Sequence, residues 1–171
     1  MGLTDGALAL AGLAAIYERR GDGKQQGALL VESAALLDKA VALQKDSGAG
    51  NSLAELAARR RFEAGQLLHN AGNHDAALMQ YAPALQGYRQ LFEALDASRD
   101  REARAVAAYG AALVSANIAA IDKGRADKAG ATQSRNDALE FLAKIEQDAE
   151  VRGNWEARVG ELQRWLAEVA K

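Results

Sequence analysis

Apolar positions along this chain recur three and four residues apart, which is the spacing that places side chains on one face of an α-helix. The clearest example is the stripe Leu78, Tyr81, Leu85, Tyr88, Phe92 and Leu95. No stretch alternates apolar and polar residues as a half-buried strand would. Helix-forming residues dominate and there is one proline. The sequence therefore predicts an all-α protein.

The pattern predicts seven helices. They are expected at about residues 5–20, 24–46, 52–71, 73–97, 100–122, 126–149 and 154–170. Ser52 and Glu55 have the spacing of a capping box, so Ser52 is expected to cap the third helix after a loop over 47–52. Ser98 and Asn154 are plausible N-caps for the fifth and seventh helices. Pro83 lies inside the fourth helical pattern, where it predicts either a kink or a break.

Three turn signals recur at nearly equal spacing, namely Gly21-Asp22, Gly72-Asn73 and Gly124-Arg125. They are separated by 51 and 52 residues, and each lies between two helical stretches. This pattern is typical of repeated helical hairpins. We expect one domain over residues 1–171, with hairpins over about 5–46, 52–97 and 100–149. The helix at 154–170 is expected to cap the apolar face of the last hairpin.

The second hairpin carries Gly65, Gly72, Ala77 and Tyr81 at the spacing of a known helical repeat. On these residues it resembles a tetratricopeptide repeat, and Gly65 and Ala77 are expected to let the two helices approach closely. The family's opening Trp is Arg61 here and its closing Pro is Arg89; the two flanking hairpins match less well.

The resemblance implies a stacked, right-handed array of about three hairpins. Because the spacing of the turns exceeds the usual repeat of about 34 residues, this would be a long-helix variant. A helical bundle with a coincidentally similar hairpin is the alternative. In this family the first helix of each hairpin lines a concave groove that accepts a peptide or a helix of another protein.

The resemblance places the partner-binding residues on the first helix of the second hairpin. These are Arg59, Phe62, Gln66, His69 and Asn70, which share one helix face. The alternative is a solvated polar face with Phe62 in the core. The carboxylate clamp of one subtype is not expected, since its Lys and Asn positions correspond to Phe62 and Gln66.

Candidate chemistry is sparse. The chain has no cysteine, two histidines and a net charge of −2, so thiolate sites are excluded and a nucleic-acid partner is not expected. His69 and His74 do not have the spacing of a paired metal site, and the three consecutive arginines at 59–61 point in different directions. We therefore expect a cytoplasmic, non-enzymatic scaffold that binds a protein or peptide, with no cofactor, metal or membrane association.

Two other functions remain open. The first is self-association as a structural or regulatory domain. Two copies would form a homodimer through alanine-rich faces or through the helix with Trp155 and Trp165. Under this alternative the chain would be a fragment of a larger signalling protein. The second is a helical enzyme or small-molecule binder with a cavity between hairpins.

Overall fold

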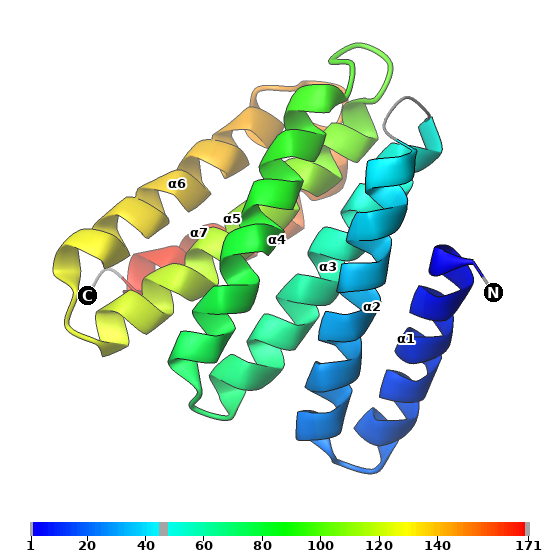
Figure 1. The fold of residues 1–171 in the computed structure, drawn as a ribbon. Helices are drawn as coiled ribbons and strands as arrows, with labels where there is room; N and C mark the ends of the chain where they lie inside the picture. Colours follow the sequence, from blue (N-terminus) through cyan, green and yellow to red (C-terminus); the bar gives the residue numbers. More distant parts are fainter. Residues whose placement is uncertain (1, 45–47, 170–171) are drawn as a thin grey trace. The chain divides into compact units, whose positions relative to one another are not determined.

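The computed structural model describes residues 2–44 and 48–169. Over these residues it contains seven α-helices and no β-strand, which confirms the all-α prediction (Figure 1). The helices are α1 (Leu3–Arg19), α2 (Gly23–Leu43), α3 (Gly48–Asn70), α4 (His74–Ala94), α5 (Arg101–Gly124), α6 (Lys128–Glu146) and α7 (Arg152–Val169).

The chain forms two compact units, Met1–Gly87 and Tyr88–Lys171. In the first unit, α1 packs on α2 and α2 packs on α3. In the second unit, α5 packs on α6, and α7 lies against both. Helices that follow one another in sequence therefore pack side by side within each unit, as the short turns require.

Three hairpin turns share one local design. Gly21 and Gly72 adopt left-handed backbone conformations, with φ of +72° and +76°. In the third turn the left-handed residue is Ala126, at φ 60°, whereas Gly124 is still the last residue of α5. The left-handed residue of this turn therefore lies two residues after Gly124, where the sequence predicted the turn. A left-handed residue after a helix lets the following N–H return to the last turn of that helix.

The hydrogen bonds confirm that the three turns are equivalent. The residue after each left-handed position is Asp22, Asn73 or Asp127, and its N–H donates to a carbonyl five residues earlier at 2.9–3.0 Å. The side chain of the same residue then accepts a hydrogen bond from a backbone N–H three residues later. One residue therefore closes the preceding helix with its backbone and caps the next helix with its side chain.

The predicted caps elsewhere are wrong. α3 begins at Gly48, so Ser52 lies inside the helix and cannot be its N-cap. α7 begins at Arg152, which places Asn154 in its first turn. Ser98 instead donates to Asp96 Oδ1, and Asp100 precedes α5. The expected end of the second helix at Asp46 and the start of the loop at Ser47 lie outside the described residues.

Pro83 lies inside α4, which is continuous from His74 to Ala94. A break at Pro83 is therefore excluded, and the kink stays a prediction. Proline lacks the N–H for one helical bond, so the surrounding packing must hold the helix together at this point. Tyr81, two residues earlier, is fully buried.

The core of each unit is built largely from small side chains. In the first unit, one cluster joins Ala14, Leu30 and Ala64, and another joins Ala7, Leu37 and Ala57. In the second unit, α5 packs against both α6 and α7, and most of its buried residues are alanine. Among the described helices, α5 alone is long and apolar enough to cross a membrane. Its burial within the unit accounts equally well for its apolar character.

Candidate binding groove

A groove of about 400 Å³ lies on the first unit, where α1, α2 and α3 meet. Each of the three helices contributes side chains to it. The lining residues are Ala11, Ala14, Ala15, Glu18, Gln26, Leu30, Arg60, Glu63, Gln66, Leu67 and Asn70. The groove therefore follows the first helices of two successive hairpins, α1 and α3.

The apolar part of the groove, which we call its floor, is made of three alanines and two leucines. Ala11, Ala14 and Ala15 lie on one face of α1 because they are three and four residues apart. Leu30 and Leu67 extend the same apolar surface from α2 and α3. Alanine side chains leave space above the helix backbone, which a bound segment could occupy.

Uncharged amides line the polar part of the groove. Gln26 comes from the first turn of α2, while Gln66 and Asn70 come from the last two turns of α3. A primary amide carries both a donor and an acceptor. These three side chains can therefore pair with the backbone N–H and C=O groups of a peptide.

The charged residues of the groove differ in how far their charges are already compensated. Glu63 accepts hydrogen bonds from Arg60 Nη1 at 2.7 Å and from Arg59 Nε at 3.0 Å. Glu18 forms no ion pair with any described residue and is exposed. The carboxylate of Glu18 is thus the one that a cationic ligand would meet at this end of the groove.

The five predicted binding residues share one broad face of α3, but they meet different neighbours across it. Gln66 and Asn70 line the groove. Phe62 is only 9% exposed and packs with its ring centroid 5.9 Å from that of Tyr81, while His69 lies 6.4 Å from the same ring. Arg59 does not line the groove, but it forms an ion pair with Glu63, which does. The structure therefore brings Gln66 and Asn70 together and places Phe62 and His69 towards α4.

The groove residues on α1 were not predicted from sequence. Their signal was present, because Ala11, Ala14, Ala15 and Glu18 share one face of α1. Ala14 on this face also belongs to the buried cluster with Leu30 and Ala64. What the sequence did not reveal is that α1 and α3 come close enough to enclose a groove.

The repeat signature has a clear packing role. A Cβ atom added to Gly65 would lie 2.5 Å from Tyr81 Cε1, so the absence of a side chain at Gly65 admits the tyrosine ring. Tyr81 and Ala77 are both fully buried. In the contact between α3 and α4, Gly65 therefore faces Tyr81, and the expected contact between Gly65 and Ala77 stays a prediction. Burial also raises the pKa of the Tyr81 hydroxyl.

The two histidines lie together at the turn between α3 and α4. Their ring centroids are 5.4 Å apart in an edge-to-face arrangement. Among the described residues, no group of three or more His, Cys, Asp or Glu side chains could hold a metal ion.

The three consecutive arginines do not form one basic patch. Arg59 and Arg60 both bind Glu63, whereas Arg61 pairs with Asp38 of α2 and reaches Gln80 of α4. Arg61 thus connects its helix to both neighbours, which is a structural use of its charge.

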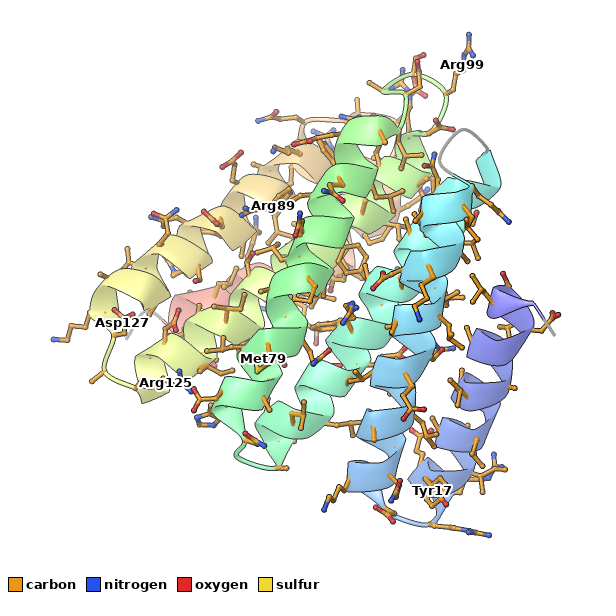
Figure 2. The ribbon with its side chains drawn as sticks, viewed as in Figure 1. Tyr17, Met79, Arg89, Arg99, Arg125 and Asp127 are labelled. Atoms are coloured by element: carbon orange, nitrogen blue, oxygen red, sulfur yellow. The ribbon has the colours of Figure 1, made fainter. Side chains whose placement is uncertain are left out.

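A second cavity, of about 520 Å³, lies where the turn between α5 and α6 meets the end of α7. Figure 2 shows Arg125 and Asp127 at this turn. Lys123 and Arg135 line the cavity and donate to the carbonyl oxygens of Glu168 and Leu166. Cations at these positions satisfy free carbonyls at the C-terminus of α7, which explains the basic character of the cavity without a ligand.

The described residues thus define an all-helical protein made of antiparallel helix pairs, with a groove on its first unit. No protein-family model matches the chain, and no curated protein matches it.

Proposed function

We propose that this protein is a non-catalytic scaffold that binds a peptide or helical segment of another protein in the groove between α1 and α3. The observation that carries the proposal is the combination of an alanine floor with the amides of Gln26, Gln66 and Asn70. An apolar floor contributes non-directional affinity, and amides along a groove recognise a peptide backbone.

The assignment to a tetratricopeptide-like array belongs to the same proposal. The signature residues around Gly72, the packing of Tyr81 against Gly65 and the placement of the groove along the first helices of successive hairpins support it. The unusually long repeat and the absence of a matching family model distinguish the chain from a standard member.

The charges favour a ligand with a basic side chain at one end. Glu63 is already paired with two arginines, whereas Glu18 is free to bind a cation.

A buried donor in the groove favours a ligand that brings a carbonyl group. Arg60 Nε is buried without a hydrogen-bond partner among the described residues. Since an unpaired buried donor costs about 1–3 kcal/mol, a small shift that lets a ligand carbonyl reach it would favour binding.

The test uses a displayed library of random peptides, selected on the intact protein. Binding of a selected peptide is then measured by fluorescence anisotropy. Ala15→Leu fills the groove without removing a hydrogen bond, and we expect it to weaken binding at least about tenfold, which corresponds to about 1.4 kcal/mol. Gln66→Ala combined with Asn70→Ala should weaken it by a similar factor.

The matched control is Ala82→Leu, the same substitution at an exposed position of α4. Glu18→Gln adds a test of chemistry, since it should remove any preference for lysine or arginine in the selected peptides. Peptides that bind all three groove variants as tightly as the parent protein would show that the groove is not the binding site. Failure to select any peptide would argue against peptide binding altogether.

Phe62→Ala is a poor test of this groove. Phe62 is buried against Tyr81, and truncation of a buried phenylalanine costs about 3–5 kcal/mol of stability. Loss of binding in that variant, alone or with Arg59→Ala, would therefore report unfolding as readily as a lost contact.

A further inference from the structure

The outer face of α1 carries apolar side chains that are not covered by the rest of the described chain. Leu8 is 54% exposed, Leu13 41% and Ile16 37%, although the opposite face of the helix buries Ala7 and Ala14. Leu13 and Ile16 are three residues apart and are therefore neighbours on the helix surface, while Leu8 is followed along the same side by Gly12 and Ile16 at steps of four. None of them lines the groove described above.

Gly12 lies in the middle of this patch. A Cβ atom added to Gly12 would meet nothing within 4 Å, so no contact within the protein requires a glycine there. A glycine in a helix interior costs about 0.5–1 kcal/mol relative to alanine. The absence of a side chain does, however, allow the backbone of a second helix to approach closely at this point.

Opposite charges lie at the two ends of the same face. Asp5 and Arg19 are each seven residues from Gly12, which is close to two helical turns, so all three residues point in nearly the same direction. Both side chains are exposed. Asp5 accepts one hydrogen bond, from the N–H of Gly2, and Arg19 forms no ion pair with any described residue.

This arrangement is complementary to itself in the antiparallel direction. If two copies of α1 cross at Gly12, Leu8 of each copy meets Ile16 of the other. Asp5 of each copy then meets Arg19 of the other, about 10 Å from the centre at 1.5 Å per residue. Leu13 lies beside the twofold axis and meets its own counterpart. A parallel pairing would instead place like charges together.

We infer that the outer face of α1 is a self-association surface, on which two copies of this chain pair antiparallel about a twofold axis through Gly12. A twofold interface uses the same surface of both subunits, and the facing charges at Asp5 and Arg19 satisfy this requirement. A single helix pair is smaller than a standard interface, so the dimer is transient and forms at high concentration.

The first experiment measures the mass of the intact protein by analytical ultracentrifugation from about 10 μM to 1 mM, the range in which weak complexes with free energies near −4 to −7 kcal/mol form. We expect a reversible monomer–dimer equilibrium. Leu8→Gln should weaken the dimer at least about tenfold. Met79→Gln, on α4, is the matched control because Met79 is also exposed, at 73%, and should leave the dimer unchanged.

The second experiment exchanges the charges. Asp5→Lys places a lysine opposite Arg19 in both halves of the dimer, and Arg19→Glu places a glutamate opposite Asp5. Each variant alone should therefore dimerise at least about tenfold more weakly, from the loss and reversal of two exposed ion pairs. When the two variants are mixed, the heterodimer contains two attractive pairs and should form as readily as the parent dimer.

Circular dichroism of each variant checks that α1 remains folded, since both charge changes also oppose the helix dipole. Should Asp5→Lys lose helicity, Leu8→Gln decides the question alone. A protein that stays monomeric over the whole range would overturn the inference and leave the face to a different chain. A dimer that Leu8→Gln does not weaken, or variants that do not recover on mixing, would place the contact elsewhere, for example at exposed Trp165.

Discussion

Single residues decide how the helices of this protein turn back on themselves. Gly21, Gly72 and Ala126 occupy equivalent left-handed positions, although only two of them are glycine. For a residue with a Cβ atom, this conformation costs about 1–2 kcal/mol. The third turn therefore contains strain that the first two avoid.

Ala126→Gly should raise the free energy of unfolding by about 1 kcal/mol, because the left-handed conformation then carries no steric cost. Urea denaturation monitored by circular dichroism measures the change. The reciprocal variant, Gly72→Ala, should lower stability by a similar amount; its added Cβ would meet nothing within 4 Å, so the backbone conformation alone is tested. Changes of the same sign in both variants would contradict this account.

Asp96 stabilises the connection between α4 and α5 through its carboxylate. Its Oδ1 accepts from Ser98 N at 2.8 Å, from Ser98 Oγ at 2.6 Å and from Arg99 N at 3.0 Å. The hydroxyl of Ser98 and these two backbone N–H groups hold the pKa of Asp96 below its usual value.

Asp96→Ala should lower the melting temperature at neutral pH, where the carboxylate is charged in both folded and unfolded protein. A carboxyl group with a lowered pKa stabilises the fold above the ordinary carboxyl range, about pH 4, and that contribution is lost as the pH falls through the folded-state pKa. The difference between variant and parent should therefore shrink in acid. Glu93→Ala, at an exposed site on α4, serves as the control, and a difference that is constant with pH would exclude the carboxylate.

At the scale of helices, close packing depends on glycines that face tyrosines. In the first unit Gly65 of α3 admits the ring of Tyr81. In the second unit Gly110 of α5 admits the ring of Tyr88, whose Cε1 lies 2.5 Å from the position of an added Cβ atom. Neither glycine has a left-handed φ, so the close approach of the ring explains its presence.

Gly65→Ala should destabilise the protein by about 1–3 kcal/mol, although alanine is the better helix former, because the fully buried Tyr81 cannot move aside. Gly160→Ala in α7 is the control of opposite sign, with a gain of about 1 kcal/mol, since an added Cβ there meets only the end of Arg164 at 3.7 Å. Thermal unfolding measures both. A stabilising Gly65→Ala would show that the helices separate without cost.

Over the whole molecule, alanine determines how the helices pack. Fully buried alanines occur in both units, including Ala34 and Ala64 in the first and Ala107 and Ala116 in the second. With small side chains at these contacts, the helices lie close together, and extra volume has no space to enter.

Ala64→Leu should therefore destabilise the protein by about 1–3 kcal/mol through overpacking between α1, α2 and α3. The exposed control Ala82→Leu should change stability by less than about 0.5 kcal/mol. Guanidinium denaturation compares the two. Equal stability of both leucine variants would mean that the contacts at Ala64 are looser than the structure describes.

Much of the fold could be read from the chain because it is locally encoded. The helical spacing of apolar residues and the turns at Gly21 and Gly72 depend on neighbours in sequence. Helix starts were less predictable, since Ser52 and Asn154 resemble caps but lie inside α3 and α7. A cap forms only where the helix ends, and packing against neighbouring helices can extend the helix past a local signal.

The candidate site was predictable only in part, for a related reason. Gln66 and Asn70 could be assigned to a polar face of α3, but Phe62 belongs to the same broad face and is buried by Tyr81. Helical spacing gives the direction of a side chain and not what lies opposite. The alanines of α1 became groove residues only when α1 was seen beside α3.

The sequence by itself thus determined the all-α class, the order of the helices and two of the three left-handed turns, because periodicity and glycine conformation act over a few residues. Only the tertiary structure decided which side chains enclose the groove, which glycines admit tyrosine rings and which face of α1 stays uncovered. These properties depend on distances between helices that are far apart in sequence, and side-chain volume summed over many contacts sets those distances.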